Sequence, residues 1–179
     1  MNRRHTLRLT FSALFLATAY LLPFATGQIQ QFGAMLCPMH IPVLLCGFLC
    51  GWPWGLAVGV LAPLLRSLTL GMPHLFPSAV CMAAELAAYG AVSALMYRVL
   101  PRHRGYIYPA LLIAMVVGRL VWGGAMWLCV GLSGGTFTLA AFFAGAVGNA
   151  LPGIALQLVL IPPLVMAVQN VYQKKGASR

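Results

Sequence analysis

Long apolar runs, separated by short polar or turn-rich segments, dominate the hydrophobic pattern of the chain. Six such runs lie at residues 9–25, 41–51, 54–70, 79–100, 108–132 and 139–168. About 20 apolar residues in a helix cross the hydrocarbon core of a membrane, and most of these runs approach or exceed that length. The pattern predicts an all-α integral membrane protein in which residues 1–179 form a single transmembrane domain of six helices.

The second and third runs are separated only by the segment Gly51-Trp52-Pro53-Trp54-Gly55. Gly and Pro interrupt helices, and Trp is enriched where a membrane meets water. The alternative is one kinked helix over both runs, which at ~1.5 Å per residue would be ~45 Å long. Because the hydrocarbon core is only about 30 Å thick, we expect a short helical hairpin.

Positive charge is concentrated in three segments outside the apolar runs. The chain has 11 Lys and Arg against one acidic residue, and all except Arg66 and Arg119 lie at 1–8, 98–107 and 169–179. With six spans and a cytoplasmic N-terminus, these segments all face the cytoplasm. The segments left outside carry no Lys or Arg: residues 26–40, 71–78 and 133–138. This positive-inside pattern predicts a multi-pass protein of the cell membrane with both termini cytoplasmic, and it argues against a nucleic-acid partner.

The first run also has features of a signal peptide. Arg3 and Arg4 precede it, and Ala25-Thr26-Gly27 is an acceptable cleavage site. Its removal would leave five spans and disrupt the charge pattern. We therefore expect this segment to remain as a transmembrane helix.

The composition excludes most enzyme classes. Hydrophobic residues make up 61% of the chain, and the mean hydropathy is +0.91. Glu85 is the one acidic residue, which removes chemistry that needs paired carboxylates, such as that of glycosidases, aspartic proteases and two-metal sites. Both lysines, Lys174 and Lys175, lie in the C-terminal segment, so the chain contains no P-loop. We expect no enzymatic activity and no cofactor, and any energy from ATP must come from a partner.

The five cysteines give no clear framework of disulfides or metal ligands. They lie in or beside the apolar runs, at Cys37, Cys46, Cys50, Cys81 and Cys129. Cys37 and His40 resemble a pair of metal ligands, but no further cluster completes a tetrahedral set. Cysteine in an apolar segment usually behaves as a small hydrophobic residue. We expect neither a disulfide framework nor a metal site.

Small residues recur at every fourth position in two places. Gly47, Gly51, Gly55 and Gly59 would let helix backbones approach closely, and we expect them to serve packing inside the protein. Ala13 and Ala17 form a similar pattern on a face of the first run that otherwise carries large residues. That alanine pair is a candidate contact for a partner protein.

Three polar residues at membrane depth are candidates for a binding site, because such residues are costly and rarely face lipid. At ~1.5 Å per residue, Glu85 lies about 10 Å below the outer surface in the fourth predicted span, and Arg119 about 15 Å below it in the fifth. Asn149 lies at about 15 Å in the sixth. We expect these side chains to share one layer. The alternative is a buried Glu85–Arg119 pair that only fixes helix register.

Further candidates lie around this layer. Arg66, about 6 Å below the outer surface, is expected to point into the same vestibule. The site would then carry a surplus of about one positive charge and favour an acidic or electron-rich substrate. Aromatic and histidine side chains complete the candidate set: Tyr89, Trp122, Trp127, His40 and His74. The uncharged outer segments 26–40 and 71–77 are expected to cover the pocket.

Short motifs accompany the six spans along nearly the whole chain. They are Ala13-x-x-x-Ala17, Pro38-Met39-His40-Ile41-Pro42-Val43, Ala62-Pro63-Leu64-Leu65-Arg66, Gly71-Met72-Pro73 and Gly118-Arg119-Leu120-Val121-Trp122-Gly123. Together with the small size and the basic cytoplasmic ends, they resemble the substrate-binding S-components of energy-coupling factor (ECF) transporters. The nickel and cobalt members of that family bind metal with an amino-terminal Met-His pair. This chain begins Met1-Asn2-Arg3, so it does not match the metal-transporting branch.

The resemblance implies an importer of vitamins or their precursors. In that family the S-component binds its substrate from the outside, while a transmembrane coupling subunit and two ATPase subunits supply the energy. The S-component is thought to topple in the membrane to release the substrate inward. The alanine motif of the first helix contacts the coupling subunit, and Ala13 and Ala17 match it.

Two other classes of function stay open from the sequence. A self-sufficient transporter or channel would need a relay of ionisable groups, whereas the spans contain few of them. In a membrane scaffold or assembly protein, Glu85 and Arg119 would be purely structural. A small molecule bound between the third and sixth spans would distinguish the S-component from both alternatives, and so would partner ATPase subunits. Finding neither would favour the scaffold.

Overall fold

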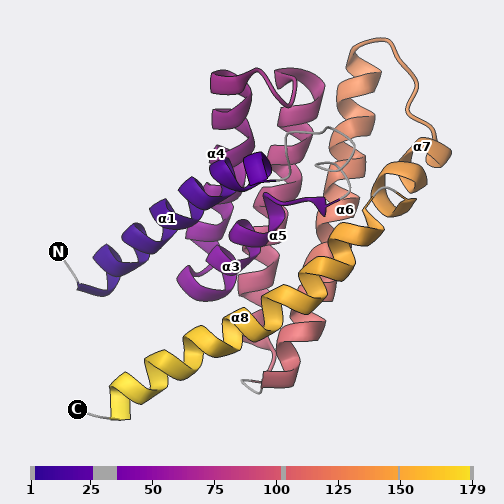
Figure 1. Ribbon diagram of the computed structural model, residues 1–179. Coiled ribbons are helices and arrows are strands. Elements are labelled where there is room, and N and C mark those ends of the chain that lie inside the picture. The colour runs from indigo at the N-terminus through magenta and orange to yellow at the C-terminus, as the bar shows by residue number, and fades with distance from the viewer. Residues whose placement is uncertain (1–2, 26–35, 102–103, 149, 178–179) are drawn as a thin grey trace.

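The computed structural model describes residues 3–25, 36–101, 104–148 and 150–177. These residues form helices joined by short turns (Figure 1). The α-helices are α1 (Arg3–Ala25), α3 (His40–Cys50), α4 (Trp52–Leu70), α5 (Val80–Val99), α6 (Ile107–Leu132), α7 (Leu139–Phe143) and α8 (Leu151–Ala177). Shorter helical turns are η1 (Leu75–Ala79), η2 (Arg104–Tyr106) and η3 (Ala144–Gly148).

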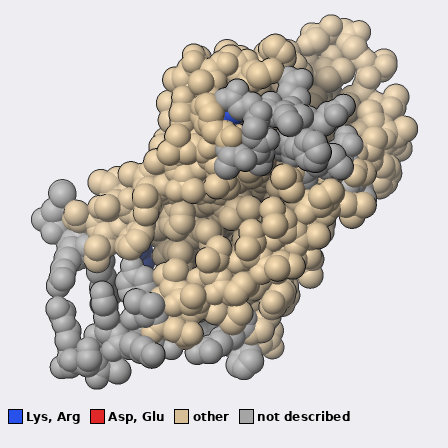
Figure 2. Space-filling model, viewed as in Figure 1, with Lys and Arg blue, Asp and Glu red and all other residues tan. Residues whose placement is uncertain are grey.

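The helices correspond closely to the predicted apolar runs. Five helical stretches are long and apolar enough to cross a membrane, and they contain α1, α4, α5, α6 and the combined α7–α8 region. The remaining run, residues 41–51, forms α3, which has 11 residues. On the face shown in Figure 2, nearly all of the described surface belongs to uncharged residues, as a surface in contact with lipid requires. The structure therefore has the predicted all-α membrane architecture.

Gly51 separates the second and third predicted spans into a hairpin. Its φ of 101° lies in a region that residues with a Cβ rarely adopt, and its backbone N–H donates to the carbonyl of Gly47 at 3.1 Å. Pro53 follows at the start of α4, where a missing N–H removes no helical hydrogen bond. The single kinked helix is thereby excluded.

Helix α5 lies at the centre of the bundle, with α4 on one side and α6 on the other (Figure 1). Glycines let α4 approach it closely: a Cβ added to Gly55 would lie only 2.6 Å from the carbonyl oxygen of Gly90. Gly59 meets the backbone of Leu86 in the same way, and Gly47 of α3 meets Ser93 and Gly90. The predicted packing role is confirmed for Gly47, Gly55 and Gly59, whereas a Cβ at Gly51 would meet nothing within 4 Å.

Helix α1 lies at the edge of the bundle and contacts α3 and α4. One side is buried, with Ser12 at 4% and Ala19 at 0% exposure. The opposite side, which includes Ala13 and Ala17, is exposed. Figure 1 shows both termini on the left, away from the turns at the top that connect α4 to α5 and α6 to α7.

Candidate functional site

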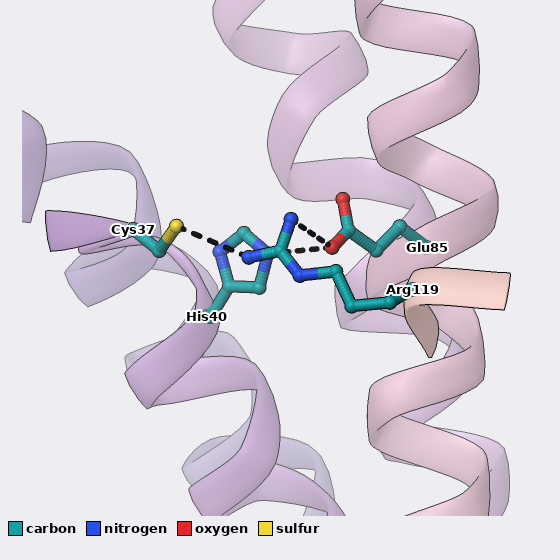
Figure 3. A network of polar contacts seen from close by, with 4 residues as sticks. All are labelled: Cys37, His40, Glu85 and Arg119. Carbon is teal, nitrogen blue, oxygen red and sulfur yellow. Dashed lines mark hydrogen bonds and ion pairs between the residues drawn. The ribbon is translucent and has the colours of Figure 1, made fainter. Parts of the chain in front are cut away.

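A buried cluster of charged and polar side chains joins three helices (Figure 3). Glu85 of α5 forms an ion pair with Arg119 of α6, with Oε1 3.0 Å from Nη1. The same oxygen lies 3.4 Å from Nε2 of His40, the first residue of α3. Glu85 and His40 are only 2% and 4% exposed. The predicted meeting of Glu85 and Arg119 is therefore observed, and His40 joins them.

Two further side chains enclose this cluster. Cys37, just before α3, accepts a hydrogen bond at Sγ from Nη2 of Arg119 at 3.6 Å. The ring of Tyr89, one helical turn below Glu85 on α5, packs edge-on against His40 with centroids 5.1 Å apart. Gly118 makes room for that ring, because a Cβ there would lie 2.9 Å from Cε2 of Tyr89. The cluster therefore has a rigid aromatic and thiol surround.

Several buried polar atoms of the cluster have no hydrogen-bond partner among the residues that the structure describes. They include Nδ1 of His40 and Nε of Arg119. The amide oxygen of Gln157, a residue of α8 that is 1% exposed, is also unpartnered within the described ranges. Each such group costs about 1–3 kcal/mol when buried. The cluster thus holds more hydrogen-bonding capacity than its own side chains use.

Arg66 does not join the cluster, which corrects the expectation that it points into the vestibule. Its Nη1 donates to the backbone carbonyl of Tyr20 at 3.0 Å, and its guanidinium lies 5.1 Å from the ring centroid of Phe24. Arg66 therefore fixes the end of α1 on α4, and the expected positive surplus at the site is absent.

Trp122 packs away from the cluster against an aromatic group near α7. Its ring stacks on Phe142 with centroids 6.3 Å apart and meets Phe137 edge-on at 6.0 Å. Trp127 is 63% exposed and lines an open apolar groove of about 340 Å³ between α6 and the segment 137–142. The structure thus brings neither Trp122 nor Trp127 to Glu85.

Two expected parts of the site cannot be compared with the structure. Asn149 and most of the predicted covering segment, residues 26–35, lie outside the described residues. Of the second covering segment, His74 is exposed and lies in the turn between α4 and α5. The described site therefore consists of His40, Glu85, Arg119 and their immediate surroundings.

Comparison with protein families decides the class of this membrane protein. Residues 7–165 match the family described as "ECF transporter, substrate-specific component". The chain belongs to this family. The comparisons with curated proteins and with solved structures gave no match. This S-component is therefore a multi-pass protein of the cytoplasmic membrane and a substrate-binding component of a transporter rather than a member of an enzyme family.

The sequence contained a signal for one buried polar residue that the prediction did not select, Gln157 of α8. Gln157 and Asn149 are the two polar side chains in the apolar run 139–168, but only Asn149 was taken as a candidate. Because a polar side chain inside a membrane span is costly, Gln157 was as strong a candidate for a functional role as Asn149. The contact of Cys37 with Arg119 could not be anticipated, since Cys37 precedes the helix and carries no depth signal.

Proposed function

We propose that this S-component captures a small vitamin or vitamin precursor from outside the cell at the His40–Glu85–Arg119 cluster. An ATP-driven ECF module then completes the import. The single observation that carries this proposal is the convergence of one carboxylate, one guanidinium and one imidazole from three helices, with hydrogen-bonding atoms left unpartnered within the described residues. Sites for small molecules usually combine an apolar surround with a few such convergent polar groups.

The unpartnered polar atoms of the cluster favour a role in substrate binding over a purely structural role. A buried ion pair that only fixes helix register contributes little to stability, because the cost of removing both charges from water offsets their attraction. Such a pair is tolerable when the remaining donors and acceptors are satisfied. Here Nε of Arg119 and Nδ1 of His40 are not satisfied by any described residue. A bound substrate would supply those partners.

We assign contacts with the substrate according to the position of each candidate residue relative to the cluster. Glu85, Arg119 and His40 are the polar anchors, and Tyr89 supplies an aromatic wall against His40. Asn149 stays in the proposal as a further polar contact, and Trp122 as a more distant aromatic residue on the same helix as Arg119. Arg66, originally proposed as a ligand, is bound to α1 and is better assigned to holding that helix.

The exposed alanines of α1 support the proposed partner. Ala13 and Ala17 lie one turn apart on the exposed side of a helix whose other side is packed on the bundle. Small side chains allow a second transmembrane helix to approach closely in lipid. We assign this face to the transmembrane coupling subunit, which two ATPase subunits would drive.

The experiment is mass spectrometry of small molecules retained by the detergent-purified chain. The comparison uses wild type, Arg119→Ala and, as a matched control, Arg98→Ala at an exposed position of α5. We expect one small molecule to accompany wild type and Arg98→Ala and to be lost from Arg119→Ala. A chain that retains nothing, yet copurifies with other membrane proteins, would support a scaffold instead.

A further inference from the structure

Two buried cysteines meet between α5 and α6, a pairing that the sequence alone did not predict. Cys81 is the second residue of α5 and is 0% exposed, and Cys129 lies three residues before the end of α6 and is 9% exposed. Both are free thiols in the structure, and the two thiols lie within hydrogen-bonding reach of each other. The contact therefore joins the two helices that carry Glu85 and Arg119.

The register of the two helices explains why these thiols meet. Helices α5 and α6 run in opposite directions (Figure 1), and the ring of Tyr89 fills the space over Gly118. Eight residues from these positions toward the α6–α7 turn are Cys81 on α5 and Met126 on α6, so Cys129 lies only ~4.5 Å beyond the level of Cys81. Cys129 is also eleven residues, about three helical turns, from Gly118. Both residues of α6 therefore face α5.

The two ends of the bundle meet different redox conditions. Disulfides form and persist in oxidising surroundings outside the cytoplasm, whereas cytoplasmic thiols are kept reduced. The charge distribution places the contact of Cys81 with Cys129 at the outer end. A second pair of touching thiols, Cys46 and Cys50, lies in α3 toward its end at Gly51, on the cytoplasmic side. Only the outer pair is therefore expected to meet an oxidant.

We propose that Cys81 and Cys129 form a disulfide by exchange with a small external disulfide, and that this bridge holds α5 against α6. Cys129 is the more exposed thiol. It loses its proton to water, and its thiolate attacks one sulfur of the external disulfide and releases the first thiol. Cys81 then loses its proton and attacks Sγ of Cys129, which releases the second thiol. The two protein thiols thereby lose two electrons and two protons, and the external disulfide becomes two thiols.

The bridge lies close to the candidate site. Cys81 precedes Glu85 by four residues, so the bridge forms about one helical turn outside the pair of Glu85 with Arg119. A cross-link between distant positions of a chain restricts the unfolded state and so stabilises the folded one. The bridge also limits how far the two helices can shift against each other. This inference concerns the fold and does not depend on which molecule the cluster binds.

The test adds oxidised glutathione, which does not cross the membrane, to intact cells that contain the full chain and have been reduced beforehand. The chain is then denatured, alkylated, purified and mapped by mass spectrometry of its peptides. We expect wild type to lose two of its five alkylatable thiols and to give a cross-linked peptide pair containing Cys81 and Cys129. Cys81→Ser should keep all of its remaining thiols, whereas the matched control Cys46→Ser should still lose two.

A second measurement tests the stabilising role of the bridge. Reduction of the oxidised, detergent-purified wild type should lower its unfolding temperature by about 5 °C or more, and reduction of Cys81→Ser should leave it unchanged. An unchanged unfolding temperature in wild type would contradict this role.

The peptide map of wild type decides the inference even where a variant fails to fold. Five alkylatable thiols after oxidation would overturn it, as would a glutathione adduct that stays on Cys129 without a bridge. A bridge between Cys46 and Cys50 in place of the outer pair would overturn it as well.

Discussion

Glu85 contacts both Arg119 and His40, so its substitution separates a binding role from a structural one. Glu85→Gln keeps the shape of the side chain but removes the charge and one acceptor. If Glu85 accepts a hydrogen bond from the substrate, affinity should fall by roughly 1.5–3 kcal/mol. Arg119 then remains as an unpaired buried charge, so thermal stability should fall as well.

The double substitution Glu85→Gln with Arg119→Gln separates the effect on affinity from the effect on thermal stability. It removes both charges, so thermal stability should return toward that of wild type while affinity stays low. Thermal unfolding and ligand titration of wild type, of the single variants Glu85→Gln and Arg119→Gln, and of the double variant measure the two quantities. Recovery of affinity in the double variant would show that the cluster is structural.

The depth estimated for each polar residue along its helix predicted some of the observed side-chain contacts and missed others. The positions of Glu85 and Arg119 placed them at similar heights, and they meet. The depth of Arg66 was estimated in the same way, but depth does not determine the direction in which the side chain points. Its guanidinium donates instead to the backbone carbonyl of Tyr20 in α1. Sequence alone gives no rotation of one helix about its axis relative to the next.

At the scale of helices, the contact of α4 with α5 depends on the absence of side chains. Gly90→Ala would place a Cβ against the backbone of Gly55. Because backbone cannot move aside as a flexible side chain does, we expect a loss of about 1–3 kcal/mol in stability. The matched control is Gly124→Ala in α6, where a Cβ meets nothing within 4 Å. Thermal unfolding should distinguish the two, and equal stability of both variants would contradict the packing described.

Helix α1 is expected to serve coupling rather than substrate binding. Ala13→Trp or Ala17→Trp adds bulk to the exposed side of α1, away from the cluster. Uptake by cells that contain the complete transporter should then be lost, while binding to the purified chain is retained. Ala13→Ser, which stays small, should preserve both. Parallel loss of binding and uptake would show instead that this side of α1 packs within the protein.

The hydrophobic pattern was sufficient for most of the helices and for the break between α3 and α4. Gly51 with Pro53 ended one helix and began the next as predicted, because one residue allows a positive φ and the other lacks an N–H. The last apolar run did not form one uninterrupted helix, since α7 and η3 precede α8. Gly145 and Gly148 in that stretch are the local signal for such an interruption.

At the scale of the whole molecule, the charge distribution predicts cytoplasmic termini. A cysteine at Ser133, in the exposed turn after α6, should react with an impermeant maleimide added from outside. A cysteine at His103, in the basic segment after α5, should react only after the membrane is opened. The five native cysteines are buried and give little background. The reverse labelling would overturn the topology.

The central claim is that the His40–Glu85–Arg119 cluster binds the substrate, and calorimetric titration of Arg119→Ala tests it most directly. The titrant is the small molecule identified from the purified wild-type protein. We predict that Arg119→Ala weakens binding by roughly 1.5–3 kcal/mol, or about tenfold to more than a hundredfold, while Arg98→Ala binds as wild type does. If Arg119→Ala binds that molecule as tightly as the wild-type chain, the cluster is not the binding site.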